Sequence, residues 1–524
     1  MRVFVMVVVL LAGLLPGQAR AAGGFFPGQF LAKLYTEALG RLPDQPSWRT
    51  AQDHFADRGC SAELLAGYGR AVFTSPEFEA LGYDRAARLL ALYRGALNRE
   101  PDRAGFDHWL SRADVAWPTL VALFHDNAEF TALAGRICAE RSYDWGVAPA
   151  IAVTDAGSPT DPTNFAGTQE QLQALVRSGV GAVALAPKAL VVLNSRFTLP
   201  AGVTLTTAGR PDVRQYALMG RLVRGAAFDD QMVYVEPNAV LERVWVDGAR
   251  GVPAAGHPSR SSVRVLGGDR TSVSHNKFSN SAGPSNVLAL GAFDGWPCGG
   301  LALRGNVVTG YSSSNHIRPQ WTDGFTVTCE GADVSDNAIV DTSDVAIVLF
   351  RSCTSEVVPS ELSGPAQRSV ARGNTVLSAG NPMYAAMGFD AAIPEAGYAA
   401  QRCDFTGAEI TGNVVWTSPN THFAIGFTVG SRAWYGRLPL VHTGVGAALV
   451  GNSTGVLTAR VGTGIAVSGM LGATVSGNDV RWVHPGGVTR CPDVDAAASI
   501  SAGTASGTFP PGTVDVAFDG CVGD

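Results

Sequence analysis

Seven asparagines recur along the second half of the chain, each inside the same short pattern. An apolar residue stands three positions before each Asn, and in five copies a Gly comes directly before it. The intervals between successive copies range from 26 to 39 residues. The series is Asn276, Asn306, Asn337, Asn374, Asn413, Asn452 and Asn478. A fixed motif at variable spacing indicates a solenoid, in which rungs stack and loops of different length leave one side.

Each rung of such a solenoid needs a sharp corner between two short strands. Gly and Asn supply this corner because both tolerate left-handed backbone angles, and stacked Asn amides can hydrogen-bond from rung to rung. Inward rows of Val, Leu and Ile leave few positions for ionic side chains, which agrees with a charged fraction of only 16%. We therefore expect a mainly β fold here.

This pattern resembles the right-handed parallel β-helix of the pectate-lyase-like superfamily, over residues 150–524. The resemblance implies a solenoid domain, which we place at residues 168–524. Its first segment, Thr168 to Ser178, has the pattern of a short amphipathic helix. We expect that helix to cap the N-terminal end of the solenoid and to cover an otherwise open sheet edge.

The preceding region is helical in pattern and contains an internal duplication. The pattern Leu-Tyr-x-x-Ala-Leu-x-Arg-x-Pro-Asp occurs at 34–44 and again at 92–102, and its apolar spacing marks one face of a helix. Residues 92–105 resemble a family of tandem bacterial extracellular domains of unknown function. We expect a small all-α domain at 27–145, followed by a linker at 146–167 rich in Ala, Pro, Thr, Asp and Gly.

The N-terminus predicts export. A basic residue, an apolar run and an Ala-x-Ala site read as a signal peptide over residues 1–21, which places the mature protein outside a bacterial cell or at its surface. The rest of the chain contains no apolar stretch long enough for a membrane span. The formal net charge of −6 argues against a nucleic-acid partner. The oligomeric state stays open.

The eight cysteines of an exported chain favour disulfides over metal ligation. Cys298 and Cys329 each lie eight residues before a repeat Asn, so they occupy equivalent positions on adjacent rungs and are predicted to pair. Cys60 and Cys138 are expected to pair within the helical domain. The remaining pairs follow only by elimination, as Cys353 with Cys403 and Cys491 with Cys521.

The densest group of polar residues lies near the centre of the solenoid. His316, Arg318 and Trp321 precede Asp323, and Asp341, Asp344 and Arg351 follow one rung later. Asp323 and Asp344 are 21 residues apart, close to the length of one compact rung. We therefore expect their carboxylates to lie on neighbouring rungs near the same corner.

At this point the chain resembles the polygalacturonase family of glycoside hydrolases. Thr322, Asp323 and Gly324 match part of that family's Asn-Thr-Asp-Gly motif, with Trp321 in place of Asn. Asp344 falls at the first Asp of the family's Asp-Asp pair, while Val345 occupies the second. The family's Gly-His-Gly and Arg-x-Lys motifs are absent downstream. In the family, the first Asp of the pair acts as the acid.

The working hypothesis is hydrolysis of an extracellular polysaccharide, with Asp344 as acid and Asp323 as base, and without a cofactor. The substrate-binding candidates are His316, Arg318, Trp321, Asp341 and Arg351. Among these, the two arginines suit an acidic sugar's carboxylate and the indole suits stacking on a ring. The same aspartates are also typical of turn caps, which accept backbone N–H bonds.

Two alternatives stay open at the level of sequence. A polysaccharide lyase would use Asp323, Asp341 and Asp344 to hold Ca²⁺ and Arg351 as base. A non-catalytic adhesive protein would instead bind polysaccharide through exposed aromatic side chains. The candidates for that role are Trp296, Trp321, Trp416, Trp434 and Tyr435. Whether the protein is an enzyme is therefore not decided by the sequence.

Overall fold

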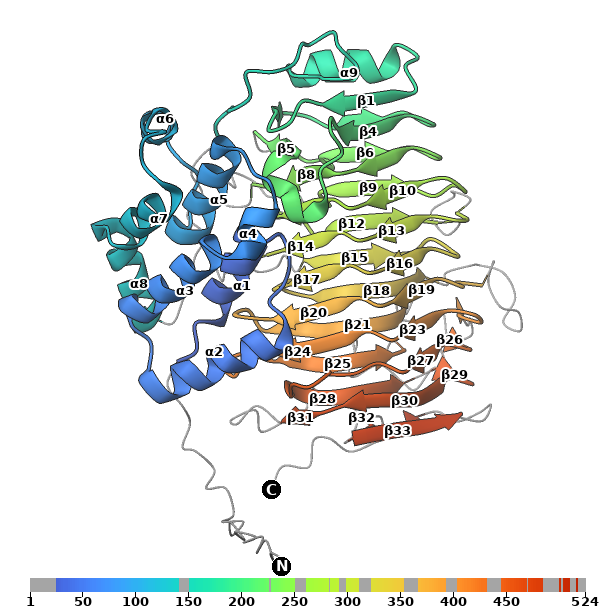
Figure 1. Cartoon of the computed structure of the whole chain (residues 1–524). Coiled ribbons are helices and arrows are strands. Elements are labelled where there is room, and N and C mark those ends of the chain that lie inside the picture. Colours follow the sequence, from blue (N-terminus) through green and yellow to red (C-terminus); the bar gives the residue numbers. More distant parts are fainter. Residues whose placement is uncertain are drawn as a thin grey trace, which may run out of the picture.

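The chain folds as a parallel β-helix with a helical module on one side (Figure 1). This is a computed structural model. It describes residues 25–140, 150–225, 228–249, 261–281, 283–291, 298–310, 322–352, 366–392, 403–430, 444–468, 470–483, 499–500, 503–508 and 515–516. Successive strands belong in turn to three long sheets, so each rung contributes one strand to each sheet.

Sheets 1 and 2 meet at the corners that carry the repeat asparagines. Sheet 1 consists of β1 (Ala182–Leu185), β4 (Thr204–Thr207), β7 (Val240–Glu242), β10 (Ser272–Ser274), β13 (Ala302–Arg304), β16 (Asp333–Ser335), β19 (Val370–Arg372), β23 (Glu409–Thr411), β27 (Ala448–Val450), β30 (Thr474–Val480) and β33 (Gly503–Thr508). Sheet 2 consists of β2 (Leu190–Leu193), β5 (Gly220–Arg224), β8 (Val244–Asp247), β11 (Lys277–Ser279), β14 (Val307–Thr309), β17 (Ala338–Val340), β20 (Thr375–Ser378) and β24 (Val414–Thr417).

Sheet 3 closes the rungs. It consists of β3 (Phe197–Leu199), β6 (Val233–Val235), β9 (Val263–Leu266), β12 (Ser285–Leu290), β15 (Asp323–Val327), β18 (Val345–Ser352), β21 (Met383–Ala392), β25 (Phe423–Val429), β28 (Ala459–Ser468) and β31 (Trp482–Val483). The strands β32 (Ser499–Ile500) and β34 (Asp515–Val516) pair antiparallel with β28, and β33 pairs antiparallel with β30. A small fourth sheet joins β22 (Cys403–Asp404), β26 (Gly444–Val445) and β29 (Met470–Leu471).

The asparagine repeat forms a continuous ladder inside the β-helix. The side-chain oxygen of Asn337 accepts hydrogen bonds from the backbone N–H of Asn306 (2.9 Å) and from its amide (3.0 Å), and the same pair of bonds links every neighbouring copy. Each Asn amide also donates to a backbone carbonyl of the preceding rung, such as Leu303 O from Asn337 (2.9 Å). The residue before Asn has a positive φ in every copy, 61° at Gly305 for example, as the corner requires.

The interior of the solenoid is filled by Val, Leu, Ile and Phe side chains from all three sheets. Its N-terminal end is covered by α9 (Gln169–Arg177), whose Leu172 and Val176 are buried against the first strands. This helix is the cap predicted from the sequence. The predicted linker reaches into the fold, because Phe165 is fully buried and its backbone pairs with Leu185.

Eight helices precede the solenoid in the described part of the chain. They are α1 (Gly28–Ala38), α2 (Gln45–Arg58), α3 (Ala62–Phe73), α4 (Pro76–Ala80), α5 (Arg85–Leu97), α6 (Arg103–Ser111), α7 (Trp117–His125) and α8 (Ala128–Glu140), and we call them the helical module. Cys60 and Cys138 form a disulfide with a Cα–Cα distance of 5.4 Å. In this region, no described helix has the length and apolar character to cross a membrane.

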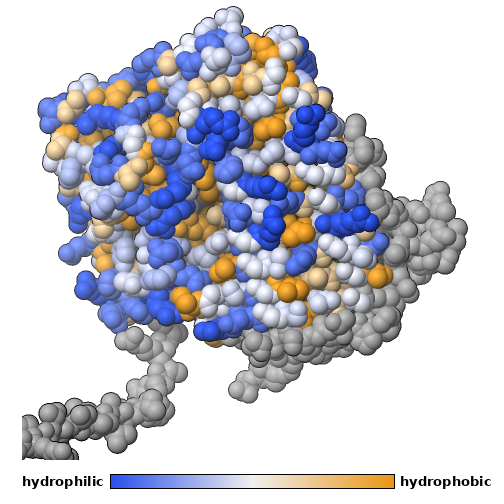
Figure 2. Space-filling model, turned by 45° about the vertical axis from the view of Figure 1, so that its right-hand side comes forward, coloured by the Kyte–Doolittle hydropathy of each residue, from blue (hydrophilic) through white to orange (hydrophobic). Residues whose placement is uncertain are grey.

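The helical module shares a hydrophobic core with sheet 2 (Figure 1). From the β-helix side this core receives Trp245, Val340, Leu377 and Trp416, all nearly inaccessible to solvent. On the surface, by contrast, the exposed large hydrophobic side chains are scattered. Figure 2 shows apolar residues dispersed among polar ones over the face that it presents. The sequence prediction that Trp416 is exposed for sugar stacking is wrong, because the helical module covers it.

A buried ionic network crosses the same interface. Lys277 of β11 pairs with Glu37 of α1 at 2.8 Å, and Arg221 of β5 pairs with Glu100 at 2.8 Å. Glu100 also pairs with Arg94 at 3.0 Å. The positive charges of Arg221, Arg94 and Lys277 surround the Trp245 ring at 3.8, 4.4 and 4.8 Å. Burying these charges costs desolvation energy, which their mutual attraction offsets only when both partners are present. Each part of the chain therefore supplies charges that the other part needs.

We expect Glu37→Gln to lower the free energy of unfolding by about 3–5 kcal/mol, because it leaves the buried Lys277 ammonium without its carboxylate. The matched control is Glu79→Gln, which breaks an exposed pair with Arg88 inside the module and should cost under about 1 kcal/mol. Denaturant titration of both variants checks this. Equal losses would contradict the assignment.

Replacing Asn337 by Ala should lower the free energy of unfolding by about 2–4 kcal/mol, because it leaves buried donors and acceptors on both neighbouring rungs unsatisfied. Asn194→Ala serves as the control, since Asn194 is exposed and lies outside the ladder. Thermal and urea unfolding of the two variants measure the difference. A loss at Asn337 no greater than that at Asn194 would argue against the ladder.

Candidate functional site

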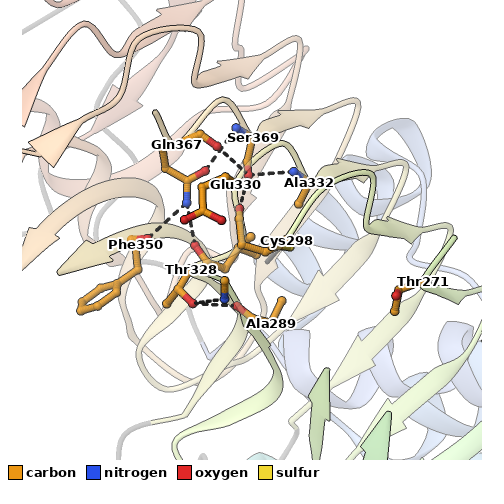
Figure 3. Close-up of a disulfide and its surroundings, with 12 residues drawn as sticks. Thr271, Ala289, Cys298, Thr328, Glu330, Ala332, Phe350, Gln367 and Ser369 are labelled. Atoms are coloured by element: carbon orange, nitrogen blue, oxygen red, sulfur yellow. Dashed lines mark hydrogen bonds between the residues drawn. A yellow bond between two sulfur atoms is a disulfide. The ribbon is translucent and has the colours of Figure 1, made fainter. Parts of the chain in front are cut away.

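Adjacent rungs are joined by a disulfide beyond the C-terminal end of β15, the strand that begins at Asp323. Cys298 and Cys329 are bonded, with a Cα–Cα distance of 5.2 Å, which is the pairing expected from their register. Around it, the side chain of Gln367 donates to the backbone carbonyl oxygens of Val327 and Phe350, and Ser369 accepts from the Ala332 N–H (Figure 3). These bonds fix β15 against β18 at the end of the strands that is opposite to Asp323.

The local backbone of β15 turns Asp323 to the outside of sheet 3. Gly324 and Phe325 follow it, and both face the core: a Cβ on Gly324 would lie 2.3 Å from the carbonyl oxygen of Ala346 and 3.2 Å from Ile339, and Phe325 is fully buried. Two successive inward residues leave Asp323 and Thr326 on the outer face. The Thr326 hydroxyl donates to the Asp323 carboxylate at 2.6 Å.

Asp323 also accepts a hydrogen bond from the backbone N–H of Val345 on the neighbouring strand β18 (3.0 Å). Burial raises the pKa of its carboxyl to about 6, while the bonds from Thr326 and Val345 act in the opposite direction by stabilising the charged form. Asp323 is therefore held by two adjacent strands.

Asp344 lies directly before β18, and its backbone is fixed on both sides. Its N–H donates to Thr322 O at 3.1 Å, and its carbonyl oxygen accepts from Tyr384 N at 3.1 Å. Burial raises the pKa of the Asp344 carboxyl to about 8, and the negative charges of Asp323 and Asp390 add to the effect. The structure thus brings Asp323 and Asp344 within electrostatic range, as their one-rung spacing predicts.

Asp390 on β21 is a third buried carboxyl with a raised pKa, and the sequence analysis does not single it out. In the sheet register it lies opposite Phe350, six residues beyond Asp344 along β18, so it acts on the other two carboxyls through its charge rather than by contact. Its side chain is only 6% exposed, and its Oδ1 has no hydrogen-bond partner. Burial and the charge of Asp323 raise its pKa well above the ordinary value. The available signal was an Asp in the middle of the otherwise apolar run 383–392, where a carboxylate has no structural advantage. We call Asp323, Asp344 and Asp390 the carboxylate cluster.

Tyr384 completes the polar surroundings. Burial raises the pKa of its hydroxyl to about 12, and the charges of Asp344 and Asp390 contribute. The phenol therefore stays protonated across the neutral range and is a hydrogen-bond donor rather than a further anion beside the carboxylates. It lies on β21 next to a small apolar cluster on the outer face that contains Val345, Val348 and Ile425.

Asp341 does not join this cluster, which corrects its prediction as a substrate-binding residue. It occupies the corner after β17 with a φ of 54°, and its carboxylate accepts from Ala379 N (2.6 Å), Gly380 N (3.1 Å) and Gln29 Nε2 (3.3 Å). Burial raises its pKa to about 7. This is the turn-capping arrangement, and it faces the helical module.

Arg351 is likewise not placed as predicted. It is buried near the far end of β18 and pairs with Glu330 at 3.4 Å, seven residues beyond Asp344. The calcium site and the arginine base of a lyase required Asp341 and Arg351 beside Asp323 and Asp344. The structure separates them, and the described residues hold no group of three His, Cys, Asp or Glu side chains suited to a metal ion.

Several predicted residues lie outside the described residues. They are the signal peptide 1–21, and His316, Arg318, Trp321, Cys353, Cys491, Cys521, Trp296, Trp434 and Tyr435. Cys403 is disulfide-bonded, while its predicted partner Cys353 is among those outside the described part. The roles of these residues stay predictions.

The chain was compared with known proteins. No protein-family model and no curated protein matches it, so the resemblances to the tandem bacterial extracellular domains and to the polygalacturonases stay predictions. Several solved structures are similar at low identity. A surface adhesin of Streptococcus pneumoniae has a TM-score of 0.38 and 8% identity, over 60% of this chain and 86% of that chain.

Two carbohydrate complexes are similar to the same extent. The tailspike protein of E. coli bacteriophage HK620, in complex with a pentasaccharide, has a TM-score of 0.32 and 12% identity, over 62% of this chain and 64% of that chain. The catalytic domain of a GH87 alpha-1,3-glucanase, in complex with nigerose, has a TM-score of 0.34 and 10% identity, over 66% and 69%. At these values, the function of this chain has to be argued from its own residues.

The carboxylate cluster should destabilise the fold as pH rises. The pKa of Asp390 is raised in the folded chain, so the folded state holds its proton after the unfolded state has released it, and stability is lost from about pH 4 up to the folded pKa. We expect Asp390→Asn to melt at a higher temperature than the unmodified protein at pH 8 and at nearly the same temperature at pH 4. Calorimetry measures both.

The control for this prediction is Asp269→Asn, because Asp269 is exposed. Its melting temperature should differ little from that of the unmodified protein at either pH. A gain of stability at Asp390 that is the same at pH 4 and pH 8 would contradict a raised pKa.

Proposed function

We propose that the protein hydrolyses glycosidic bonds of an extracellular polysaccharide at the carboxylate cluster. The observation that carries the proposal is the unequal surroundings of two buried carboxyls on adjacent strands. Two hydrogen bonds, from Thr326 and the Val345 N–H, stabilise the charged form of Asp323, whereas burial and the charge of Asp323 favour the protonated form of Asp344 and raise its pKa. Glycoside hydrolysis requires one carboxyl that keeps its proton and one that has lost it. At pH 7 these two residues meet that requirement.

In this proposal Asp344 donates its proton to the glycosidic oxygen as the bond to the anomeric carbon breaks. The Asp323 carboxylate removes a proton from the attacking water, or attacks the anomeric carbon itself, and the bonds from Thr326 and Val345 hold it ready. With water as nucleophile, the water proton passes to Asp323 and its oxygen to the sugar. Tyr384 lies beside the acid, with its backbone N–H on the Asp344 carbonyl oxygen, and the charge of Asp390 favours the protonated form of Asp344.

Asp390 does not restore the polygalacturonase pattern. That family uses an Asp-Asp pair, whereas this chain has Val345 after Asp344. The third carboxyl comes from β21, the strand that pairs with β18. Asp390 therefore raises the Asp344 pKa through its charge and does not take the place of the second Asp of the family's pair.

The extracellular location is part of the proposal. It is supported by the Cys60–Cys138 and Cys298–Cys329 disulfides, because disulfides persist mainly in oxidising compartments. The hydrolytic reaction needs no metal ion. The lyase alternative loses its support, since Asp341 and Arg351 are engaged elsewhere.

The proposal predicts a bell-shaped dependence of kcat/KM on pH. Activity should rise with the ionisation of Asp323 near pH 6 and fall with the loss of the Asp344 proton near pH 8, giving an optimum near pH 7. Reducing-end release from a panel of polysaccharides across this pH range measures the profile. Activity that rises steadily above pH 9 would rule out the assignment of Asp344 as the acid.

Asp323→Asn and Asp344→Asn should each lower kcat by about a hundredfold or more, because each removes a proton-transfer group. Asp333→Asn is the control, since Asp333 lies on sheet 1 and pairs with Arg372 (2.8 Å). The same assay compares the three. Full activity in Asp323→Asn would discard the mechanism, absorbance near 235 nm from an unsaturated product would indicate a lyase, and binding without turnover would indicate an adhesive protein.

A further inference from the structure

The first helix of the module reaches the corner of the β-helix that carries Asp344. α1 begins at Gly28, whose backbone lies so close to sheet 2 that a Cβ would sit 2.5 Å from Ala379 O and 2.9 Å from Ser418 Cβ. Gly380 is equally close from the other side, with a Cβ there 2.5 Å from the side chain of Gln29. Two glycines thus permit a close approach between α1 and the turn after β20.

At this approach the module contacts Asp341 directly. Gln29, 6% exposed, donates to the Asp341 carboxylate at 3.3 Å. The same carboxylate accepts the N–H groups of Ala379 and Gly380 on the next rung. One buried side chain therefore joins α1, the corner after β17 and the turn after β20.

Asp341 and Asp344 are the two ends of a single four-residue corner between sheets 2 and 3. Within it, the Ser343 hydroxyl accepts the Thr322 N–H at 2.9 Å, and the N–H of Asp344 donates to Thr322 O. These bonds tie both ends of the corner to neighbouring strands and turns, so we expect a shift of Asp341 to be passed to Asp344. A cavity of about 300 Å³ adjoins the contact, and Gln29, Gly380 and Asn420 are among the residues that line it.

We propose that Gln29 and Asp341 form a positioning contact, by which the helical module holds the corner that places the Asp344 carboxyl in the carboxylate cluster. This inference rests on the proposed function, and it gives the module a part in the reaction. Gln29 and Asp341 touch no substrate. They act on the reaction only through the position of Asp344.

The chain offers a matched control for this proposal. Gln45 of α2 makes the same kind of contact between the module and the β-helix, donating to Thr454 O (2.9 Å) and accepting from Val456 N (2.7 Å). It lies away from the Asp341–Asp344 corner. Gln29→Ala and Gln45→Ala each remove a glutamine that joins the two parts, but only the first touches the proposed link.

The experiment measures the pKa of Asp344 and the kinetics of the full chain. Protein labelled with ¹³C at the Asp carboxyl carbons is titrated by NMR, and the Asp344 signal is identified by its loss in Asp344→Asn. In Gln29→Ala the Asp344 pKa should fall by about one unit towards its ordinary value, because the carboxyl becomes better hydrated. The kcat on whichever polysaccharide is cleaved should fall about tenfold with KM unchanged. Gln45→Ala should change neither quantity.

Asp341 provides the conservative rescue. In Asp341→Asn the amide oxygen can still accept the Ala379 and Gly380 bonds, and its NH₂ can donate to Gln29 Oε1 after rotation of that amide, so the Asp344 pKa and kcat should stay near the original values. Asp341→Ala should reproduce Gln29→Ala. Thermal melting of every variant establishes that it is folded.

The outcomes separate this inference from the proposed function. An unchanged Asp344 pKa in Gln29→Ala, or an equal change in Gln45→Ala, would overturn the positioning contact. If no polysaccharide is cleaved by any form of the protein, hydrolysis fails, but the titration still decides whether Gln29 holds Asp344.

Discussion

The fold depends on a register that repeats without error from rung to rung. The asparagine ladder sets it, because each side-chain amide bonds both to the next Asn and to a backbone carbonyl of the preceding rung. A slip of one residue would leave these buried groups unsatisfied and turn apolar side chains outward. All that lies on the outer faces, including the carboxylates, is placed by this register.

The carboxylate cluster illustrates how a regular solenoid acquires an irregular site. Burial is unfavourable for each aspartate, and their mutual repulsion adds to the cost. The pKa values of Asp323, Asp344 and Asp390 are raised for this reason, because the surroundings of each carboxyl favour its protonated form. The proposed acid–base chemistry requires carboxyls of this kind.

The helical module is an integral part of the protein rather than an appendage. Its ionic network with sheet 2 matches buried charges on both sides, such as Glu37 with Lys277 and Glu100 with Arg221. The N-terminal end of its first helix contacts Asp341, at the other end of the corner that carries Asp344. Stability and the proposed chemistry therefore depend on the same interface, although different residues serve each.

The sequence by itself determined the features that depend on short-range patterns. The Asn repeat predicts the ladder, the eight-residue offset of Cys298 and Cys329 predicts their bond, and the 21-residue spacing of Asp323 and Asp344 predicts that they approach each other. In each case a local motif marks the same point on successive rungs. Because the rungs stack, residues at the same position on successive rungs lie close together.

Only the tertiary structure decided the rest. Asp390 joins the cluster from 46 residues beyond Asp344, and no local motif marks its rung. Asp341 is three residues from Asp344, yet the corner between two sheets turns it towards α1, and Trp416 and Lys277 are buried because the helical module covers sheet 2. The physical reason is that a repeated local motif sets the register within the solenoid. The docking of the helical module on sheet 2 depends instead on surfaces that are assembled from distant parts of the chain.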